Sequence, residues 1–288
     1  MQSFQEVHNY EQEQLPLRIF KRDIGEGFGS FLLHWHEEIE VLYIYQGKGQ
    51  VQINLTNYQV ESGDILIISP ESMHGGNNIG DTALGCYALV FPLTIFANTR
   101  DKVYQAYFRP LVEQEMELMP LITKSNFQYL MLKNRIMNII NLTEKRPLTY
   151  DLQQKMELFG LLTDVILTGG KRAKIEAPEL DKGISDMRRL IKYMTDNSHK
   201  KLTLENLAEY CGYSKYHFLR LFKKNTGCSC IAYLNQVRLE KAAQALQFTD
   251  DQVSSICYEV GFDNVSYFIR AFKKHYRFSP LKYRNKMK

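Results

Sequence analysis

The sequence has 288 residues and a formal net charge of +4, and its length predicts two domains. Hydrophobic residues make up 44% and charged residues 24%, a balance that excludes disorder over the whole chain. No apolar run approaches the roughly 18 residues that a transmembrane helix needs, and the polar start predicts no signal peptide. The five scattered cysteines, an odd number, indicate reduced thiols in the cytoplasm.

The charge is distributed unevenly along the chain. From Asp181 onward, 20 lysines and arginines stand against 10 aspartates and glutamates, a net of +10, while the preceding residues carry 16 against 22, a net of −6. A basic C-terminal third indicates a module that binds a polyanion such as DNA. Two domains that merely differ in surface charge would give the same division, so the charge alone leaves both interpretations open.

Short runs of β-branched and aromatic residues predict strands in the first third of the chain. The runs are 31–33, 41–45, 51–55, 65–68 and 87–91. Glycine-containing segments at 47–49, 61–64 and 74–78 are expected to form turns between them. Many short strands with close turns favour a small barrel or sandwich.

Helical spacing of apolar residues replaces this pattern further along the chain. Two helices are expected at about 126–142 and 150–167, separated by Pro147. The polar, aperiodic stretch after Gly170 predicts a linker over 171–180. The predicted domains are therefore 1–170 and 181–288.

After the linker the chain is expected to be entirely helical. Helices are predicted at about 184–195, 204–210, 215–224, 230–246, 253–260 and 265–275, with a short one after Pro280. Thr249 and Gln252 fit a capping box at the start of the fifth of these helices.

An internal repeat lies within this helical region. The run from Phe218 to Lys224 recurs as Phe268 to Lys274 at an offset of 50 residues, and Gly212 recurs as Gly261 at an offset of 49. Each copy is a short helix, a glycine-containing turn and a second helix, which predicts two helix-turn-helix units at about 203–224 and 251–274. The intervening helix, about 24 Å long, can set both units on one face of DNA.

The second helix of each unit has two distinct faces. Phe218, Leu221 and Phe222 lie on one side, as do Phe268, Ala271 and Phe272 in the second copy, and these sides are expected to be buried. The opposite sides carry Arg220 and Arg270 in register, and arginine can bind guanine through two hydrogen bonds. A merely solvated cationic face is the plain alternative, and the duplication argues against it.

Residues 181–288 resemble the DNA-binding domain of the AraC/XylS family of bacterial transcription regulators. The resemblance is carried by 233–242, 260–262, 266–274 and 279–284. It implies base contacts in both units, and the nearby lysines suit phosphates. The predicted DNA-binding residues are Lys215, Tyr216, Leu219, Arg220, Lys223, Lys224, Asn264, Val265, Ser266, Arg270, Lys273 and Lys274. The chain departs from the family at Arg277, where glycine is usual, and at Leu219, where a polar residue is common.

A second candidate site lies among the predicted strands. His34 and His36 share one face of a strand, and Glu40 and His74 would complete a set of three imidazoles and a carboxylate suited to Fe, Mn, Ni or Zn. The spacing of these residues resembles the two cupin motifs, which implies a cupin-like β-barrel followed by two α-helices.

Several interpretations of this barrel remain open. These interpretations are a metal-free sensor of a small effector, a metal-assisted sensor, a metal-dependent enzyme with a nucleic-acid-binding tail, and a scaffold that serves only for oligomerisation. The family resemblance favours a metal-free sensor, with a carbohydrate as the commonest effector by analogy. His34, His36, Glu40 and His74 are then effector-binding residues, no catalytic residue or cofactor is expected, and no metal is favoured, although these four residues would hold one.

The sequence therefore predicts a two-domain, mixed fold, with a cupin-like N-terminal barrel and an all-α C-terminal domain. The expected function is that of a cytoplasmic, sequence-specific transcription regulator, an activator rather than an enzyme. Its expected partners are double-stranded promoter DNA, a small-molecule effector, a second copy joined through the helices at 126–167, and RNA polymerase. No membrane partner is expected.

Overall fold

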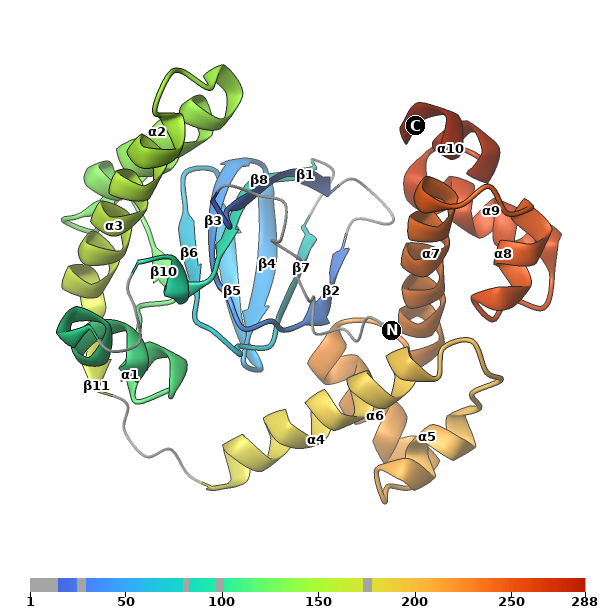
Figure 1. Ribbon diagram of the computed structural model, residues 1–288. Helices are drawn as coiled ribbons and strands as arrows, with labels where there is room; N and C mark the ends of the chain where they lie inside the picture. The colour runs from blue at the N-terminus through green and yellow to red at the C-terminus, as the bar shows by residue number, and fades with distance from the viewer. Residues whose placement is uncertain (1–14, 25–29, 80–82, 97–100, 173–177, 288) are drawn as a thin grey trace. The chain divides into compact units, whose positions relative to one another are not determined.

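The computed structural model describes residues 15–24, 30–79, 83–96, 101–172 and 178–287 (Figure 1). The chain divides into two compact units, one ending at Asp181 and the other beginning at Lys182. The first is rich in β-structure and the second is helical. The predicted two-domain, mixed fold is therefore confirmed.

The first unit contains two antiparallel sheets. The five-stranded sheet has the order β1 (Arg18–Ile24), β8 (Leu84–Phe91), β3 (Ile39–Gln46), β6 (Ile65–Ile68) and β10 (Leu121–Ile122). The four-stranded sheet has the order β2 (Ser30–His34), β7 (His74–Asn78), β4 (Lys48–Ile53) and β5 (Thr56–Glu61). A short pair, β9 (Met116–Glu117) and β11 (Lys171–Arg172), completes the strands of the described chain.

Strand β3 explains how the apolar core is divided into two layers. Leu42 and Ile44 face the four-stranded sheet and pack with Val51 and Ile53 of β4. Val41 and its alternate neighbours on β3 point to the opposite face and pack against helices. Because both faces of β3 are covered over residues 39–44, this part of the strand is apolar except for Glu40.

The helical layer of this unit lies against the outer face of the five-stranded sheet (Figure 1). It contains the 3-10 turn η1 (Leu93–Ile95), the π-helical turn η2 (Tyr104–Phe108), α1 (Arg109–Val112), α2 (Tyr129–Lys145) and α3 (Tyr150–Gly169). Arg135 of α2 donates to Asp164 of α3 at 2.6 Å and to Glu157 at 3.0 Å. These bonds fix α2 and α3 as an antiparallel pair.

One turn prediction and the end of one predicted strand are wrong. Residues 74–78, expected to form a turn, are strand β7, in which Gly76 pairs with both Phe31 and Val51. Ladder hydrogen bonds come from the backbone, so glycines do not prevent them. The strand expected at 51–55 ends at Ile53, because Asn54 and Leu55 both have positive φ and make the two-residue turn to β5.

The predicted linker differs from the structure at both ends. Lys171 and Arg172 form β11, and α4 (Pro178–Asp196) begins six residues before the helix expected at 184. Proline has a fixed φ and no N–H, which suits the first position of a helix. Residues 173–177 lie outside the described part of the chain.

The helices predicted after Asp181 are all present. After α4 they are α5 (Leu204–Tyr210), α6 (Lys215–Thr226), α7 (Cys230–Phe248), α8 (Val253–Glu259), α9 (Val265–Tyr276) and α10 (Pro280–Met287). Within the described residues, no helix is long and apolar enough to cross a membrane.

The predicted capping box at Thr249 is wrong. Thr249 ends α7 and its hydroxyl donates to the carbonyl of Ala245, while the N-cap of α8 is Gln252, whose side chain makes no capping bond. Thr249 therefore lies too far before α8 to cap it. A capping box occurs instead at the start of α5, between Thr203 and Asn206.

Candidate functional site

The first helix-turn-helix unit consists of α5 and α6. Ser214 is the N-cap of α6 and accepts a hydrogen bond from the backbone N–H of His217 at 3.4 Å. Phe218 and Phe222 are each only 1% exposed and anchor the helix. The face away from this core is accessible, and Tyr216 at its N-terminal end is 78% exposed.

The second unit consists of α8 and α9 and repeats this arrangement. Asn264 is the N-cap of α9 and accepts from the backbone N–H of Tyr267 at 2.8 Å. Phe268 and Phe272 are fully buried, while Arg270 is exposed on the other side of the helix. The predicted core positions Leu221 and Ala271 are half-buried.

Most of the predicted DNA-binding residues are exposed. These are Lys215, Tyr216, Arg220, Lys223, Lys224, Asn264, Ser266, Arg270, Lys273 and Lys274. Leu219 and Val265 are half-buried, and Val265 packs against the core of the second unit. Lys215 forms an ion pair with Glu205 of α5, which links the two helices of the first unit. The exposed faces of α6 and α9 thus carry matching positive charges.

Helix α7 joins the two units and also holds the end of α4. It has 19 residues and is about 28 Å long. Arg238 donates to the carbonyls of Ser198 and Lys200 at 2.8 and 3.0 Å, and Lys241 donates to the carbonyl of Thr195 at 2.7 Å. The sequence does not predict these two positioning residues, because their acceptors lie about 40 residues away in the chain.

The four residues predicted as an effector or metal site come together in the first unit. The pairing of β2 with β7 sets His34 opposite His74, while Glu40 lies on β3 of the other sheet. His34, His36, Glu40 and His74 are all buried, with exposed fractions between 0% and 5%. We call these four residues the histidine cluster.

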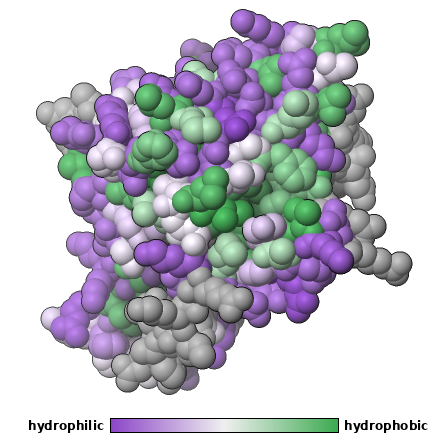
Figure 2. All heavy atoms as spheres, turned by 90° about the vertical axis from the view of Figure 1, so that its left-hand side faces the viewer, coloured by the Kyte–Doolittle hydropathy of each residue, from purple (hydrophilic) through white to green (hydrophobic). Residues whose placement is uncertain are grey.

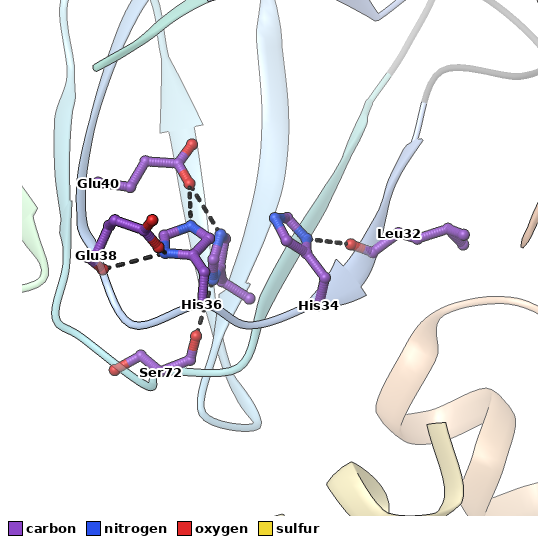
Figure 3. Close-up of polar contacts among 7 residues, drawn as sticks. Leu32, His34, His36, Glu38, Glu40 and Ser72 are labelled. Carbon is purple, nitrogen blue, oxygen red and sulfur yellow. Dashed lines mark hydrogen bonds and ion pairs between the residues drawn. The ribbon is translucent and has the colours of Figure 1, made fainter. Parts of the chain in front are cut away.

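Backbone oxygens orient the three imidazoles of the histidine cluster (Figure 3). The Nδ1 atom of His34 lies 2.7 Å from the carbonyl of Leu32, that of His36 lies 3.1 Å from the carbonyl of Glu38, and that of His74 lies 2.8 Å from the carbonyl of Ser72. A carbonyl only accepts, so each Nδ1 carries a hydrogen. The sequence does not predict the parts that Glu38 and Ser72 play in this site.

Glu40 is shared by two of these rings. Its Oε2 atom lies 3.0 Å from Nε2 of His36 and 3.0 Å from Nε2 of His74. Burial raises the pKa of Glu40, but the hydrogen bonds and charges of the two imidazoles outweigh burial and hold that pKa well below its ordinary value. Glu40 is therefore a buried carboxylate.

The residues present fit a divalent transition metal. Four potential ligand atoms, one from each residue of the histidine cluster, lie within 4.8 Å of one another. Imidazole and carboxylate are the donors that such ions take, and ligating histidines usually donate their other ring N–H to a carbonyl or carboxylate. The cluster can thus hold a cation or an oxygen-rich small molecule.

Comparisons with known proteins identify both units. Residues 17–126 match the AraC-like ligand binding domain, and residues 207–286 match a helix-turn-helix domain. The chain is 24% identical to YdeC, an HTH-type transcriptional regulator of Bacillus subtilis, over 98% of this chain and 96% of YdeC. The chain belongs to the AraC family of transcriptional regulators.

Other relatives match a smaller part of the chain. It is 36% identical to the MmsAB operon regulatory protein of Pseudomonas aeruginosa over 38% of this chain and 36% of that protein. It is 32% identical to the lactose operon transcription activator of Staphylococcus xylosus over 40% of this chain and 41% of that protein. The chain thus spans about two fifths or less of the length of these two proteins.

The two candidate sites of this AraC-family regulator lie in different matched domains. The histidine cluster falls within the matched ligand binding domain, and α6 and α9 fall within the matched helix-turn-helix domain. The family therefore accounts for a DNA-binding unit and a ligand-binding unit in one chain.

Proposed function

We propose that this regulator reads two segments of the DNA major groove through α6 and α9, and that a small ligand in its β-rich unit controls this binding. The observation that carries the proposal is the matched pair of faces. In both helices two phenylalanines are buried, while Arg220 or Arg270 is exposed at the same position relative to them. A helix of this kind can place arginine against guanine and lysine against phosphates.

A binding experiment with the full chain tests the groove assignment. A random DNA library is first enriched on the protein, and affinity for the selected sequence is then measured by gel shift. Arg220→Ala and Arg270→Ala are each expected to cost about 1–3 kcal/mol of specific binding. Lys192→Ala, a change at an exposed position of α4, serves as the control. If neither arginine variant loses affinity, α6 and α9 do not read the groove.

We also propose that the ligand site is the histidine cluster and that the chain is a regulator rather than an enzyme. Its buried carboxylate and oriented imidazoles would bind a ligand between the two sheets. A ligand can shift DNA binding only if its affinity differs between the two states of the protein. A carbohydrate effector and a metal-dependent catalytic site are the alternatives, and both would also depend on these four residues.

A second copy of the chain is proposed to bind the exposed face of α2 and α3. Figure 2, which looks onto the side where these helices lie, shows hydrophobic side chains gathered near its centre. Leu130 is 68% exposed on α2, and Leu152, Met156 and Leu167 on α3 are 58% to 68% exposed. So many large apolar side chains on one pair of helices favour a protein interface.

Sedimentation of the full chain tests this interface. Met156→Glu is expected to shift the chain from dimer to monomer, because the interface would then bury an unpaired charge. Gln59→Glu, at an exposed polar position of β5 in the same unit, is the control. A wild-type chain that stays monomeric at micromolar concentration would rule out this interface.

Activation of transcription is the regulatory direction that we propose. It is supported by the similarity to the lactose operon transcription activator. An activator bound at a promoter in the cytoplasm would act through contact with RNA polymerase. A reporter gene placed behind the selected DNA sequence tests the direction, since expression should rise when the regulator is produced.

A further inference from the structure

Helix α7 packs against both reading helices, at different places along its length. Tyr233, near the start of α7, is fully buried and meets Phe222 of α6 edge-on, with ring centroids 5.6 Å apart. Further along, Leu239 and Leu246 of α7 share an apolar core with Phe272 of α9. The core that holds α9 therefore begins more than one helical turn beyond the residue that holds α6.

A polar contact bridges this separation. The Nδ2 atom of Asn235 on α7 donates to the hydroxyl oxygen of Tyr267 in the first turn of α9, at 3.1 Å. Asn235 follows Tyr233 by two residues, so the donor lies on the part of α7 that packs against α6. The Asn235–Tyr267 bond thus ties the N-terminal end of the second reading helix to the segment that holds the first one.

The ring of Tyr267 has further support from the turn of the second unit. Its centroid lies 6.1 Å from that of Phe262, and the guanidinium of Arg238 lies 5.7 Å from the Phe262 centroid. Arg238 comes three residues after Asn235, so the two side chains share one face of α7. The tyrosine ring is therefore held in place by its own unit, with its hydroxyl directed to Asn235.

The first unit shows which part of this arrangement belongs to the repeat. At the offset of 50 residues the equivalent of Tyr267 is His217, whose ring contacts Tyr213 of the same unit at 4.9 Å between centroids. A ring contact between the turn and the reading helix is thus common to both units. The bond from Asn235, by contrast, reaches from the second unit to the helix that both units share.

We propose that the Asn235–Tyr267 bond fixes the tilt of α9 on α7 and thereby sets the spacing of the two DNA segments that the regulator reads together. The inference rests on the proposed function, in which both α6 and α9 enter the major groove. Apolar packing is non-directional, so the buried face of α9 by itself allows the helix to rock on its core. A hydrogen bond is directional, and this one holds the end of α9 that carries Ser266 and Arg270.

The geometry of DNA makes this tilt important. One extra base pair between the two segments moves the second segment by about 3.4 Å and turns it by about 35° around the DNA axis. A rigidly held α9 cannot follow such a change, whereas a loosely held one can follow part of it. Asn235 and Tyr267 are therefore positioning residues, which act through the orientation of α9.

The binding test uses the full chain and the DNA sequence selected as described above. Affinity is compared with that for DNA in which one base pair is inserted or removed between the two protected segments, and the ratio measures spacing discrimination. Tyr267→Phe and Asn235→Ala should each lower this ratio about fivefold, the contribution of a typical hydrogen bond. The double variant should lower it no further, because both changes remove the same bond. Tyr213→Phe, which removes a hydroxyl from the first unit, is the matched control and should keep the wild-type ratio.

A distance measurement tests the clamp without DNA. Spin labels carried by unnatural amino acids replace Lys223 and Lys273, two exposed residues of the reading helices. The distribution of distances between the labels should be broader in both bond variants than in the wild type or in Tyr213→Phe. A width that is unchanged in both bond variants would overturn the inference.

The remaining outcomes separate this inference from the proposed function. A wild type that binds all three DNAs equally would overturn the inference, as would bond variants that lose affinity for all three by the same factor. In the second case the two residues would only support the fold or contact the DNA. Arg220→Ala and Arg270→Ala are measured on the same DNA. A broadened distance distribution together with arginine variants that bind as the wild type does would overturn the proposed function and leave the clamp in place.

Discussion

In the first helix-turn-helix unit the turn glycine has open space around it, whereas in the second unit the equivalent glycine is enclosed. A Cβ on Gly212 would meet no atom within 4 Å. A Cβ on Gly261 would overlap the carbonyl oxygen of Ser198 and lie 2.9 Å from Nε of Arg238. The second turn therefore packs against the residues that follow α4 and against the middle of α7, and the first turn does not.

This difference shows what a repeated sequence does and does not specify. Each copy makes the same turn and buries the same phenylalanine pair, because these features depend on residues within one unit. The neighbours differ because each copy meets a different part of the domain. The same substitution is consequently expected to have different effects in the two units.

The largest expected difference is at the turn glycines. Gly261→Ala should lower the free energy of unfolding by about 2–3 kcal/mol, because φ is +102° and the added carbon overlaps backbone. Gly212→Ala should cost about 1 kcal/mol, since only its φ of +68° is unfavourable. Urea unfolding of the full chain, followed by helical circular dichroism, measures both. Equal losses would show that the packing around Gly261 has no energetic weight.

Substitutions at the N-caps of α5 and α8 should change the free energy of unfolding by an intermediate amount, with opposite signs in the two units. Thr203 caps α5 through its side chain, so Thr203→Ala should cost about 1 kcal/mol. Gln252 occupies the N-cap of α8 with extended backbone but makes no side-chain cap, so Gln252→Ser should add up to about 1 kcal/mol. Thermal unfolding of the two variants beside the wild type checks both signs, and a destabilised Gln252→Ser variant would contradict the prediction.

The smallest expected effect is at the ends of the reading helices. Gly227 ends α6 with φ of +74°, and Arg277 ends α9 with φ of +65°. Arg277 therefore adopts the left-handed conformation that suits the glycine usual at this position in the family. Arg277→Gly should relieve this strain and raise the free energy of unfolding by up to about 1 kcal/mol. This figure already subtracts the entropy that glycine adds to the unfolded chain. Gly227→Arg should lower the free energy of unfolding by a similar amount. A destabilised Arg277→Gly variant would mean that contacts of the Arg277 side chain outweigh the strain.

The sequence predicted the helical unit more closely than the β-rich unit. The limits of α5 agree with the prediction at both ends, because a helix is specified by local spacing and by caps such as Thr203. Strand β7 was missed because its pairing partners, β2 and β4, lie elsewhere in the chain. A strand can be formed by backbone alone, and residues 74–78 gave no local signal for it.

The histidine cluster shows the same division within one site. His34, His36, Glu40 and His74 could be named from their types and spacing. The roles of Glu38 and Ser72 could not, because their backbone oxygens orient the rings, although the carboxylate of Glu38 also lies 3.5 Å from Nδ1 of His36. Backbone carbonyls are common to all residues, so no sequence pattern marks them.

By itself the sequence determined the duplicated helix-turn-helix units, the faces of α6 and α9, and the residue types of the histidine cluster. Only the tertiary structure decided that Gly261 is crowded, that Arg238 and Lys241 hold the end of α4, and that both ring nitrogens of His36 and His74 meet oxygen atoms. Periodicity and capping act between residues a few positions apart, and a sequence displays them directly. Packing brings together atoms from distant segments, and their distances exist only once the chain has folded.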